Sequence, residues 1–512
     1  MSRSEEAWLA AVRAEVVGGN LQRAGELAGQ ALAAFPESPD LRRAQAGILQ
    51  QCGLTDRAET ALRSVLAQCP DDAGAAFSLA RMLCEQGRTD AAAAVMRACF
   101  SVDVHGHDAN LAINAIELLD GCDRKADASA IAETAITANR SDSRLHAYAG
   151  MLAIQLGAFE RAREHYLFAL EHDPHAVEWH VPIGLSSTLR YENPSHPDFA
   201  RFRVALERKD LSDLARAELH FALGKACDDV GDHAEAAHQF RSGNSIRKSG
   251  STWSRKAWRR TIEARLAASA NTTTADPTPD FTPVFIVGMP RSGTTLLAEW
   301  LGRFPDVCNR GEQPWLARLA LQPDLAGSPD PDSLRRAAAK YTARVRQDDA
   351  GSARWFIDKQ PLNLRYLDLA LALFPDARII HCQRNPRDNA LSLWMQCFLE
   401  DVQGYSYDFD DINVVMRDCG RLMTHWRERY PDAIRTVHYE DVVAAPDKVV
   451  GELATWIGIP DATGAADSRD QASRNAIGSA SLWQARQAVY SRSVGRWKDY
   501  ALHVPELARL PE

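Results

Sequence analysis

The feature that most constrains the first half of this chain is a glycine followed five residues later by an alanine. It recurs as Gly19/Ala24, Gly53/Ala58, Gly87/Ala92, Gly157/Ala162 and Gly231/Ala236. Glycine permits a tight left-handed turn between two antiparallel helices, and the small alanine lets those helices approach closely. Pro36, Pro70 and Pro174 lie at matching places, where proline ends a second helix before the next unit begins. The pattern predicts a stack of helical pairs.

The first three of these glycines lie about 34 residues apart, which is the period of the tetratricopeptide repeat, and the region resembles such an array. A unit near Gly121 to Ala128 has its turn shifted toward Asp123, and residues 177–213 break the period. The resemblance implies a superhelix whose concave groove binds a peptide or partner protein. The alternative is a purely structural or dimerising array. We expect the repeat domain to span residues 1–248.

Composition separates this array from a second domain. The chain has 512 residues, of which 46% are hydrophobic and 25% charged, as in ordinary globular proteins of two or three domains. Residues 269–283, SANTTTADPTPDFTP, have the composition of a linker. We therefore expect a helix and linker over residues 249–282 and a separate domain over residues 283–512.

Charge and cysteine usage narrow the class of protein. The net charge of -9 argues against a general nucleic-acid binder, because affinity for phosphate backbones needs clustered positive charge. The 10 cysteines include no CxxC pair, which favours reduced thiols over a disulfide framework. The start of the chain is acidic where a signal peptide would be basic and then apolar, and no apolar run approaches the ~18 residues of a membrane helix. We expect a cytoplasmic protein that makes no membrane contact.

A glycine-bearing loop opens the second domain. The apolar run Val284–Val287 predicts a buried parallel strand, and the leucines and tryptophan of residues 296–301 fall at helical spacing. Between them lies a loop whose backbone N–H groups can cradle a phosphate. It is nearly a Walker loop, but Thr294 stands where the lysine belongs, which argues against hydrolysis of ATP or GTP. The basic residue is instead Arg291.

The run PRSGTT (residues 290–295) directly behind a strand resembles the phosphate loop of sulfotransferases that use phosphoadenosine phosphosulfate (PAPS), particularly the tyrosylprotein sulfotransferase-like branch. The resemblance covers approximately residues 283–500. It implies an α/β domain with a parallel sheet, PAPS as co-substrate bound at the carboxyl ends of the strands, and phosphoadenosine phosphate (PAP) as product without a metal. The residues it assigns to the 5′-phosphosulfate end are Arg291, Ser292, Gly293, Thr294 and Thr295.

A second strand–turn–helix pattern follows at residues 377–392. Arg384 and Ser392 match the family residues that hold the donor's 3′-phosphate, and the planar fork of arginine suits bidentate contacts to phosphate. Taken alone, they are better explained as a surface arginine and a helix-lining serine, but behind the PRSGTT loop we favour contacts to a phosphate. The family often has a further basic residue one turn later, where this chain has Gln396.

Two more motifs supply candidate catalytic groups. Glu312 matches the family's general base, which takes the proton of the acceptor hydroxyl. Gln313 and Trp315 depart from the family pattern, in which a second glutamate and a substrate-reading arginine are common. Lys359 matches a lysine that neutralises charge on the leaving phosphate. An exposed glutamate and an exposed lysine are the alternative readings.

The end of the chain carries the remaining candidates. Tyr439 and Ser481 match family contacts to the donor, and Arg496 matches a cation that reaches a nucleotide phosphate. Tyr439 could equally be a core aromatic residue. No His, Cys, Asp or Glu cluster has metal-ligand spacing, and we interpret His381, His425 and His438 as structural.

The sequence therefore predicts an all-α repeat superhelix followed by a P-loop α/β domain with a parallel sheet. The expected activity is in-line transfer of a sulfuryl group from PAPS to an acceptor hydroxyl, and the expected acceptor is a tyrosine of a peptide or protein. Glu312 would be the base, and Arg291, Lys359 and Ser481 would stabilise negative charge. The alternatives are a carbohydrate or small-metabolite acceptor, another P-loop enzyme such as a small-molecule kinase, and a non-catalytic scaffold.

Overall fold

The computed structural model describes residues 3–100, 105–267, 273–327, 329–348, 350–398, 401–460 and 491–511. The chain forms two compact units, one of residues 1–149 with 347–349 and the other of residues 150–346 with 350–512.

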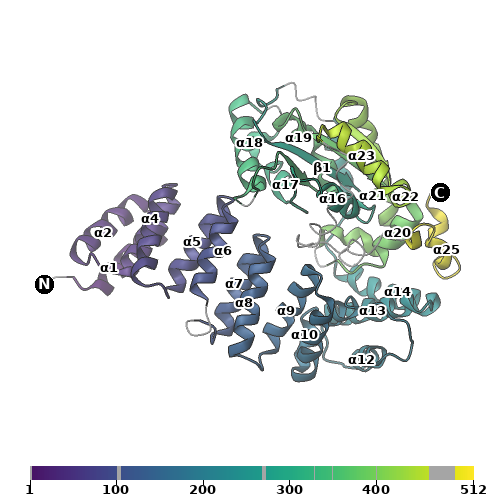
Figure 1. Cartoon of the computed structure of the whole chain (residues 1–512), viewed down its shortest axis with the longest axis horizontal. Helices are drawn as coiled ribbons and strands as arrows, with labels where there is room; N and C mark the ends of the chain where they lie inside the picture. The colour runs from purple at the N-terminus through teal and green to yellow at the C-terminus, as the bar shows by residue number, and fades with distance from the viewer. Residues whose placement is uncertain are drawn as a thin grey trace. The chain divides into compact units, whose positions relative to one another are not determined.

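The first unit is built from helical pairs (Figure 1). Its helices are α1 (Glu5–Val17), α2 (Leu21–Ala34), α3 (Pro39–Gln51), α4 (Thr55–Gln68), α5 (Ala73–Glu85), α6 (Thr89–Cys99), α7 (Ala109–Gly121) and α8 (Lys125–Ala138). Side chains of Ser4, Ser38, Asp72 and Asp108 cap the first helix of each pair by accepting a backbone N–H. The repeated alanines of the second helices are fully buried.

The turns within the pairs have the left-handed geometry predicted from the glycines. Gly19, Gly53 and Gly87 have φ angles of 77°, 74° and 76°. In the degenerate unit the left-handed residue is Asp123, with φ of 61°, while Gly121 belongs to α7. The tetratricopeptide reading of this region and its shifted turn are therefore confirmed.

The expectation of reduced cysteines holds for eight of them, which are free thiols, and is wrong for one pair. Cys84 in α5 and Cys122 at the end of α7 form a disulfide whose Cα atoms lie 6.2 Å apart. They are separated by 38 residues in sequence, about one repeat, and therefore carry no short-range motif. Stacking of successive units brings them together, which sequence spacing alone did not show.

The second unit begins with further helices and ends with the α/β domain. Helix α9 (Ser143–Leu156) runs into it from the first unit. There follow α10 (Phe159–His172), η1 (Pro174–Glu178), α11 (Val181–Ser186), α12 (Pro197–Leu206), α13 (Asp213–Asp229), α14 (His233–Gly250) and α15 (Arg255–Ala267). The predicted break of the period at 177–213 contains the short elements η1, α11 and α12.

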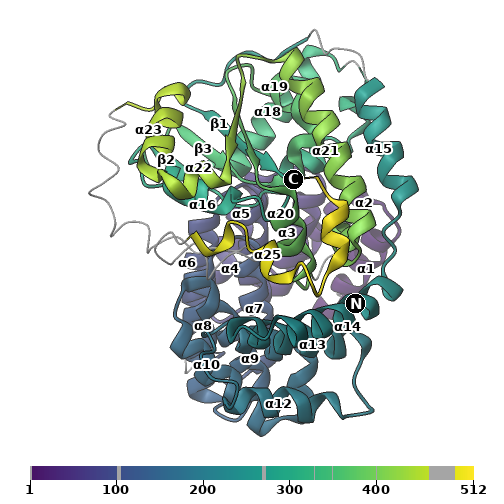
Figure 2. The same cartoon turned by 90° about the vertical axis from the view of Figure 1, so that its right-hand side faces the viewer.

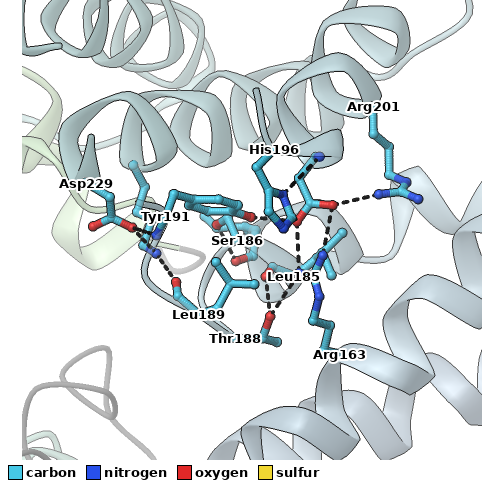
Figure 3. Close-up of polar contacts among 12 residues, drawn as sticks. Arg163, Leu185, Ser186, Thr188, Leu189, Tyr191, His196, Arg201 and Asp229 are labelled. Carbon is cyan, nitrogen blue, oxygen red and sulfur yellow. Dashed lines mark hydrogen bonds and ion pairs between the residues drawn. The ribbon is translucent and has the colours of Figure 1, made fainter. Parts of the chain in front are cut away.

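A buried polar network holds this break together (Figure 3). The carboxylate of Asp198 is fully buried and accepts two hydrogen bonds from Arg163, at 2.9 and 3.1 Å. Arg201 donates to it at 2.6 Å and the hydroxyl of Tyr191 at 2.8 Å. Burial alone would raise the pKa of Asp198, but the hydrogen bonds from Arg163 and Tyr191 outweigh burial and lower this pKa.

The α/β domain contains one parallel sheet. Its strands are β1 (Thr282–Gly288), β2 (Val307–Asn309), β3 (Trp355–Asp358), β4 (Arg378–Gln383) and β5 (Ile434–His438), in the spatial order β2-β3-β1-β4-β5. Every pairing is parallel. Strand β1 is central, so the loop after it lies between the ends of its neighbours β3 and β4.

Helices cover both faces of this sheet (Figure 2). The helical elements of this domain are α16 (Thr294–Leu301), α17 (Trp315–Leu319), η2 (Pro323–Leu325), α18 (Pro331–Arg346), η3 (Pro361–Tyr366), α19 (Leu367–Leu373), α20 (Pro386–Trp394), η4 (Asp401–Tyr407), α21 (Phe409–Arg429), α22 (Tyr439–Ala444), α23 (Pro446–Ile457), η6 (Ser491–Ser493), α25 (Trp497–Tyr500) and η7 (Pro505–Arg509). Helices α16 and α23 share a core with Val284 and Ile286 of β1. On the other face Phe285 contacts Tyr341 of α18. The predicted fold class is confirmed.

Residues 273–281 of the expected linker form no helix or strand, although Ala275 and Phe281 are buried. The domain bounds of the sequence analysis stay a prediction. Within the described ranges, no helix is both long and apolar enough to cross a membrane.

We predict that Asp198→Asn lowers the free energy of unfolding by about 1–3 kcal/mol, because it removes the buried negative charge that pairs with the half-buried guanidinium groups of Arg163 and Arg201. The wild-type advantage should shrink in acid, since stability from a lowered carboxyl pKa is lost as the pH falls through it. Urea unfolding at several pH values measures both effects. Asp210→Asn is the matched control, because Asp210 is an exposed carboxylate that also pairs with an arginine, Arg208, and its substitution should change stability little.

Candidate active site

The loop between β1 and α16 has the geometry of an anion cradle. Strand β1 ends at Gly288, and α16 begins at Thr294 with Gly293 as its N-cap. Gly293 has φ of 92° and Arg291 has φ of 68°, so the chain turns sharply and its N–H groups precede a helix N-terminus. Thr294 and Thr295 are buried in the first turn.

Both glycines of this loop are required by close neighbours. A Cβ on Gly288 would lie 2.3 Å from the carbonyl oxygen of Cys382 in β4. A Cβ on Gly293 would lie 2.4 Å from the ring of Tyr439. The loop is therefore packed between the end of β4 and the start of α22, with no room for larger residues.

The second predicted motif lies against the first. The side chain of Arg384 donates to the carbonyl of Arg291 at 3.0 Å, and Arg291 Nε donates to Ser392 Oγ at 3.2 Å. The guanidinium of Arg384 lies 4.7 Å from the ring centre of Tyr439, and it also donates to the carbonyl of Ser493 at 2.6 Å. Burial lowers the pKa of Arg384. The two motifs thus meet at neighbouring strand ends.

The structure also brings the predicted catalytic pair together. Lys359 Nζ donates to Glu312 Oε1 in a short ion pair. The side chain of Lys359 is only 3% exposed, whereas that of Glu312 is 40% exposed. The lysine is therefore held inside, and the carboxylate is open to an incoming molecule.

The final segment, residues 491–511, lies across α20. The buried carboxylate of Asp388 accepts N–H bonds from Gly495 at 2.6 Å and from Trp497 at 2.8 Å. Arg496 forms a short ion pair with Asp228 of α13, and Tyr500 donates to the same carboxylate at 2.6 Å. Arg496 therefore lies on this segment with an acidic partner, which the sequence did not predict.

Ser481 lies outside the described residues, so the structure gives no account of it. Gln396, where the family often has a cation, donates to the carbonyl of Cys397 at 3.4 Å. His381 is buried, and burial lowers its pKa to about 4, so it is neutral at pH 7.

Sequence reasoning missed two residues that shape this site. Asp388 anchors the final segment, and Asn389 donates to the carbonyl of Pro290 at 2.9 Å, which holds the phosphate loop. Both follow the N-cap Asn385. An acidic residue in a first helical turn is so common that it carried no specific signal.

The arrangement fits a phosphate-bearing group. The hydroxyl of Ser292 and the Nε of Arg384 are buried and have no hydrogen-bond partner among the described residues. Residues of both loops, among them Met289, Ser292, Arg384 and Asn385, line a cavity of about 530 Å³. In the described ranges, no three His, Cys, Asp or Glu residues are placed to hold a metal ion.

Comparison with known proteins gives a match for the α/β domain: residues 283–463 match the model of the sulfotransferase family. An uncharacterized protein of Aquifex aeolicus is 29% identical over 306 residues, 56% of this chain and 40% of that protein. Protein-tyrosine sulfotransferase 1 of Danio rerio is 27% identical over 204 residues, 35% of this chain and 54% of that protein.

The chain therefore spans about half or less of the length of these two curated relatives. Among solved structures, the sulfotransferase domain of the Synechococcus olefin synthase is 21% identical, with a TM-score of 0.33 over 47% of this chain and 97% of that domain.

We predict that Gly293→Ala destabilises the phosphate loop, since the left-handed φ alone costs about 1–2 kcal/mol and the added Cβ meets Tyr439. A lower melting temperature by circular dichroism checks this. Gly451→Ala in α23 is the control, because its Cβ has open space and alanine favours a helix by about 0.5–1 kcal/mol. Equal melting temperatures for the two variants would contradict the assigned loop geometry.

Proposed function

We propose that this protein transfers a sulfuryl group from PAPS to an acceptor hydroxyl. The observation that carries the proposal is the contact between the two phosphate-type motifs. Arg291 of the first loop bonds to Ser392 of α20 at 3.2 Å, while Arg384 bonds back to the first loop at 3.0 Å. A nucleotide with phosphates at both its 5′ and 3′ positions needs two such groups side by side, whereas ATP needs one.

The loop residues would hold the 5′ end of the donor. Ser292, Gly293, Thr294 and Thr295 offer backbone and hydroxyl donors at the start of α16. The donor supplies an activated sulfuryl group. Because Thr294 replaces the Walker lysine, this loop lacks the cation that normally reaches the terminal phosphates of a nucleoside triphosphate.

Arg384, Ser392 and Arg496 would hold the 3′-phosphate, with Tyr439 packed beneath Arg384. An arginine has five N–H donors, so the pair of Arg496 with Asp228 is compatible with a phosphate contact.

The open carboxylate of Glu312 would take the proton of the acceptor hydroxyl. Arg291 and the buried Lys359 would stabilise negative charge on the sulfuryl group and on the departing phosphate, and we propose the same role for Ser481. Fixed cations in a partly dry site act strongly because little solvent screens them.

The acceptor that we propose is a tyrosine of a peptide or protein, and we place the reaction in the cytoplasm. The tetratricopeptide pairs support a polypeptide acceptor, because stacked helical repeats present an extended surface suited to peptides. The similarity to a protein-tyrosine sulfotransferase over 204 residues supports the same choice.

We predict that calorimetry detects tight binding of PAP and much weaker binding of ATP. Arg384→Ala should weaken PAP binding by about 1.5–3 kcal/mol, roughly tenfold to hundredfold, because a charge-assisted contact is lost. Arg335→Ala, whose pair with Asp332 is exposed, is the control and should bind PAP normally. Binding of ATP as tight as that of PAP would contradict the proposed donor.

We predict that Glu312→Gln lowers kcat about 10²–10⁴-fold while PAP affinity stays within a few fold, since a general base acts in the transition state. Transfer of radiolabelled sulfate from PAPS to a tyrosine peptide measures kcat. Glu452→Gln, an exposed change in α23, is the matched control. Undiminished turnover of Glu312→Gln would eliminate Glu312 as the base.

A further inference from the structure

A carboxylate in the helices that precede the sheet binds an arginine of the final segment. Asp228 lies in the last turn of α13, which forms a helical pair with α14 around the left-handed Gly231. The side chain of Asp228 is 8% exposed and forms an ion pair with the guanidinium of Arg496. The hydroxyl of Tyr500 donates to its other oxygen at 2.6 Å. A residue of the preceding helices therefore binds the arginine that the proposed function assigns to the 3′-phosphate.

The place of Asp228 is unfavourable for a carboxylate. The C-terminal end of a helix carries partial negative charge, and a second acidic residue, Asp229, follows directly. Burial adds a further cost unless hydrogen bonds and an opposite charge compensate for it. Arg496 and Tyr500 supply both, and both belong to the final segment. What Asp228 does is therefore to be sought in that segment.

The backbone around Arg496 is fixed from the other side, by the α/β domain. Gly495 turns the chain with φ of 73°, and its N–H donates to the buried Asp388 of α20 at 2.6 Å. The N–H of Trp497 donates to the other oxygen of Asp388 at 2.8 Å. Helix α20 also carries Ser392, another candidate contact to the 3′-phosphate. Both sequence neighbours of Arg496 are thus tied to the helix on which that contact lies.

The final segment also contacts the third candidate for this phosphate. The carbonyl of Ser493, three residues before Arg496, accepts a hydrogen bond from Arg384 at 2.6 Å. Two guanidinium groups gathered for one phosphate repel each other, and a long arginine side chain loses rotamer freedom when it is ordered. The ion pair with Asp228 counters both effects, because it holds the guanidinium of Arg496 before any ligand is bound.

Resting on the proposed function, we propose that Asp228 is a positioning residue that holds Arg496 in place for the 3′-phosphate of the donor. Asp228 does not itself contact the donor. It fixes the side chain of Arg496 while Asp388 fixes the backbone, so that donor binding has to order less of the chain. Selection of a nucleotide with a 3′-phosphate then depends in part on a helix that precedes the sheet.

The test is Asp228→Ala, which removes the carboxylate that binds Arg496. Calorimetry should show PAP binding about 3–10-fold more weakly, which is the effect of having to order one long side chain on binding. The affinity for adenosine 5′-phosphosulfate, which lacks the 3′-phosphate, should not change. A general disturbance of the fold would weaken binding of both nucleotides, so the difference between them reports the position of Arg496.

Tyr500→Phe is the matched control. It removes the second bond to Asp228 and leaves the ion pair with Arg496, so it should bind PAP as wild type does. In an Arg496→Ala background, Asp228→Ala should change PAP affinity no further, because the arginine through which Asp228 acts is gone.

Equal or tighter binding of PAP by Asp228→Ala would overturn the positioning role, and tighter binding would mean that the carboxylate competes with phosphate for Arg496. An equal loss of affinity for both nucleotides would overturn it as well. If wild type binds no PAP, the proposed function fails and takes this role with it. If wild type binds PAP and Asp228→Ala binds it equally well, only the role of Asp228 fails.

Discussion

The close approach between the loop after β1 and the end of β4 is the constraint on which the rest of the site depends. Gly288 must lack a side chain because the Cys382 carbonyl occupies its Cβ position. Because the two strands pair in register up to Gly288 and Cys382, their following loops leave the sheet at the same level. Arg291 and Ser392 can then meet, and Arg384 can reach back to the first loop. The pairing of the β1 and β4 backbones therefore determines where these side chains can meet.

Much of this could be predicted from local pattern. The glycines of the repeat and the apolar run of β1 each act through near neighbours in sequence, so their left-handed turns and buried strand were predictable. The break in the repeat period was predictable. The hydrogen-bond network around Asp198 that stabilises it was not, because this network joins residues of α10 and α12 that lie far apart in sequence. The Cys84–Cys122 bond and the Asp228–Arg496 pair likewise depend on stacking between distant segments.

The candidate site divides in the same way. Sequence motifs identified four of the candidate residues. In the structure, Lys359 binds Glu312, and Arg384 binds the backbone of Arg291. Asp388, which anchors the final segment beside Arg384, was not found. It is an ordinary acidic residue in the first turn of a helix, and only the backbone N–H groups that it binds distinguish it. Such positioning contacts leave no spacing signature in one sequence.

The final segment, residues 491–511, bears on whether the α/β domain could fold without the helices that precede it. It is fastened on one side to Asp388 of α20 and on the other to Asp228 of α13, a helix that precedes the sheet by more than fifty residues. Helix α14 adds a bond from Asn244 to the carbonyl of Trp394 at 2.8 Å. The sheet with its own helices is therefore not a detachable module. A chimera that replaced the preceding helices would therefore have to keep Asp228, which binds Arg496 and Tyr500 of the final segment.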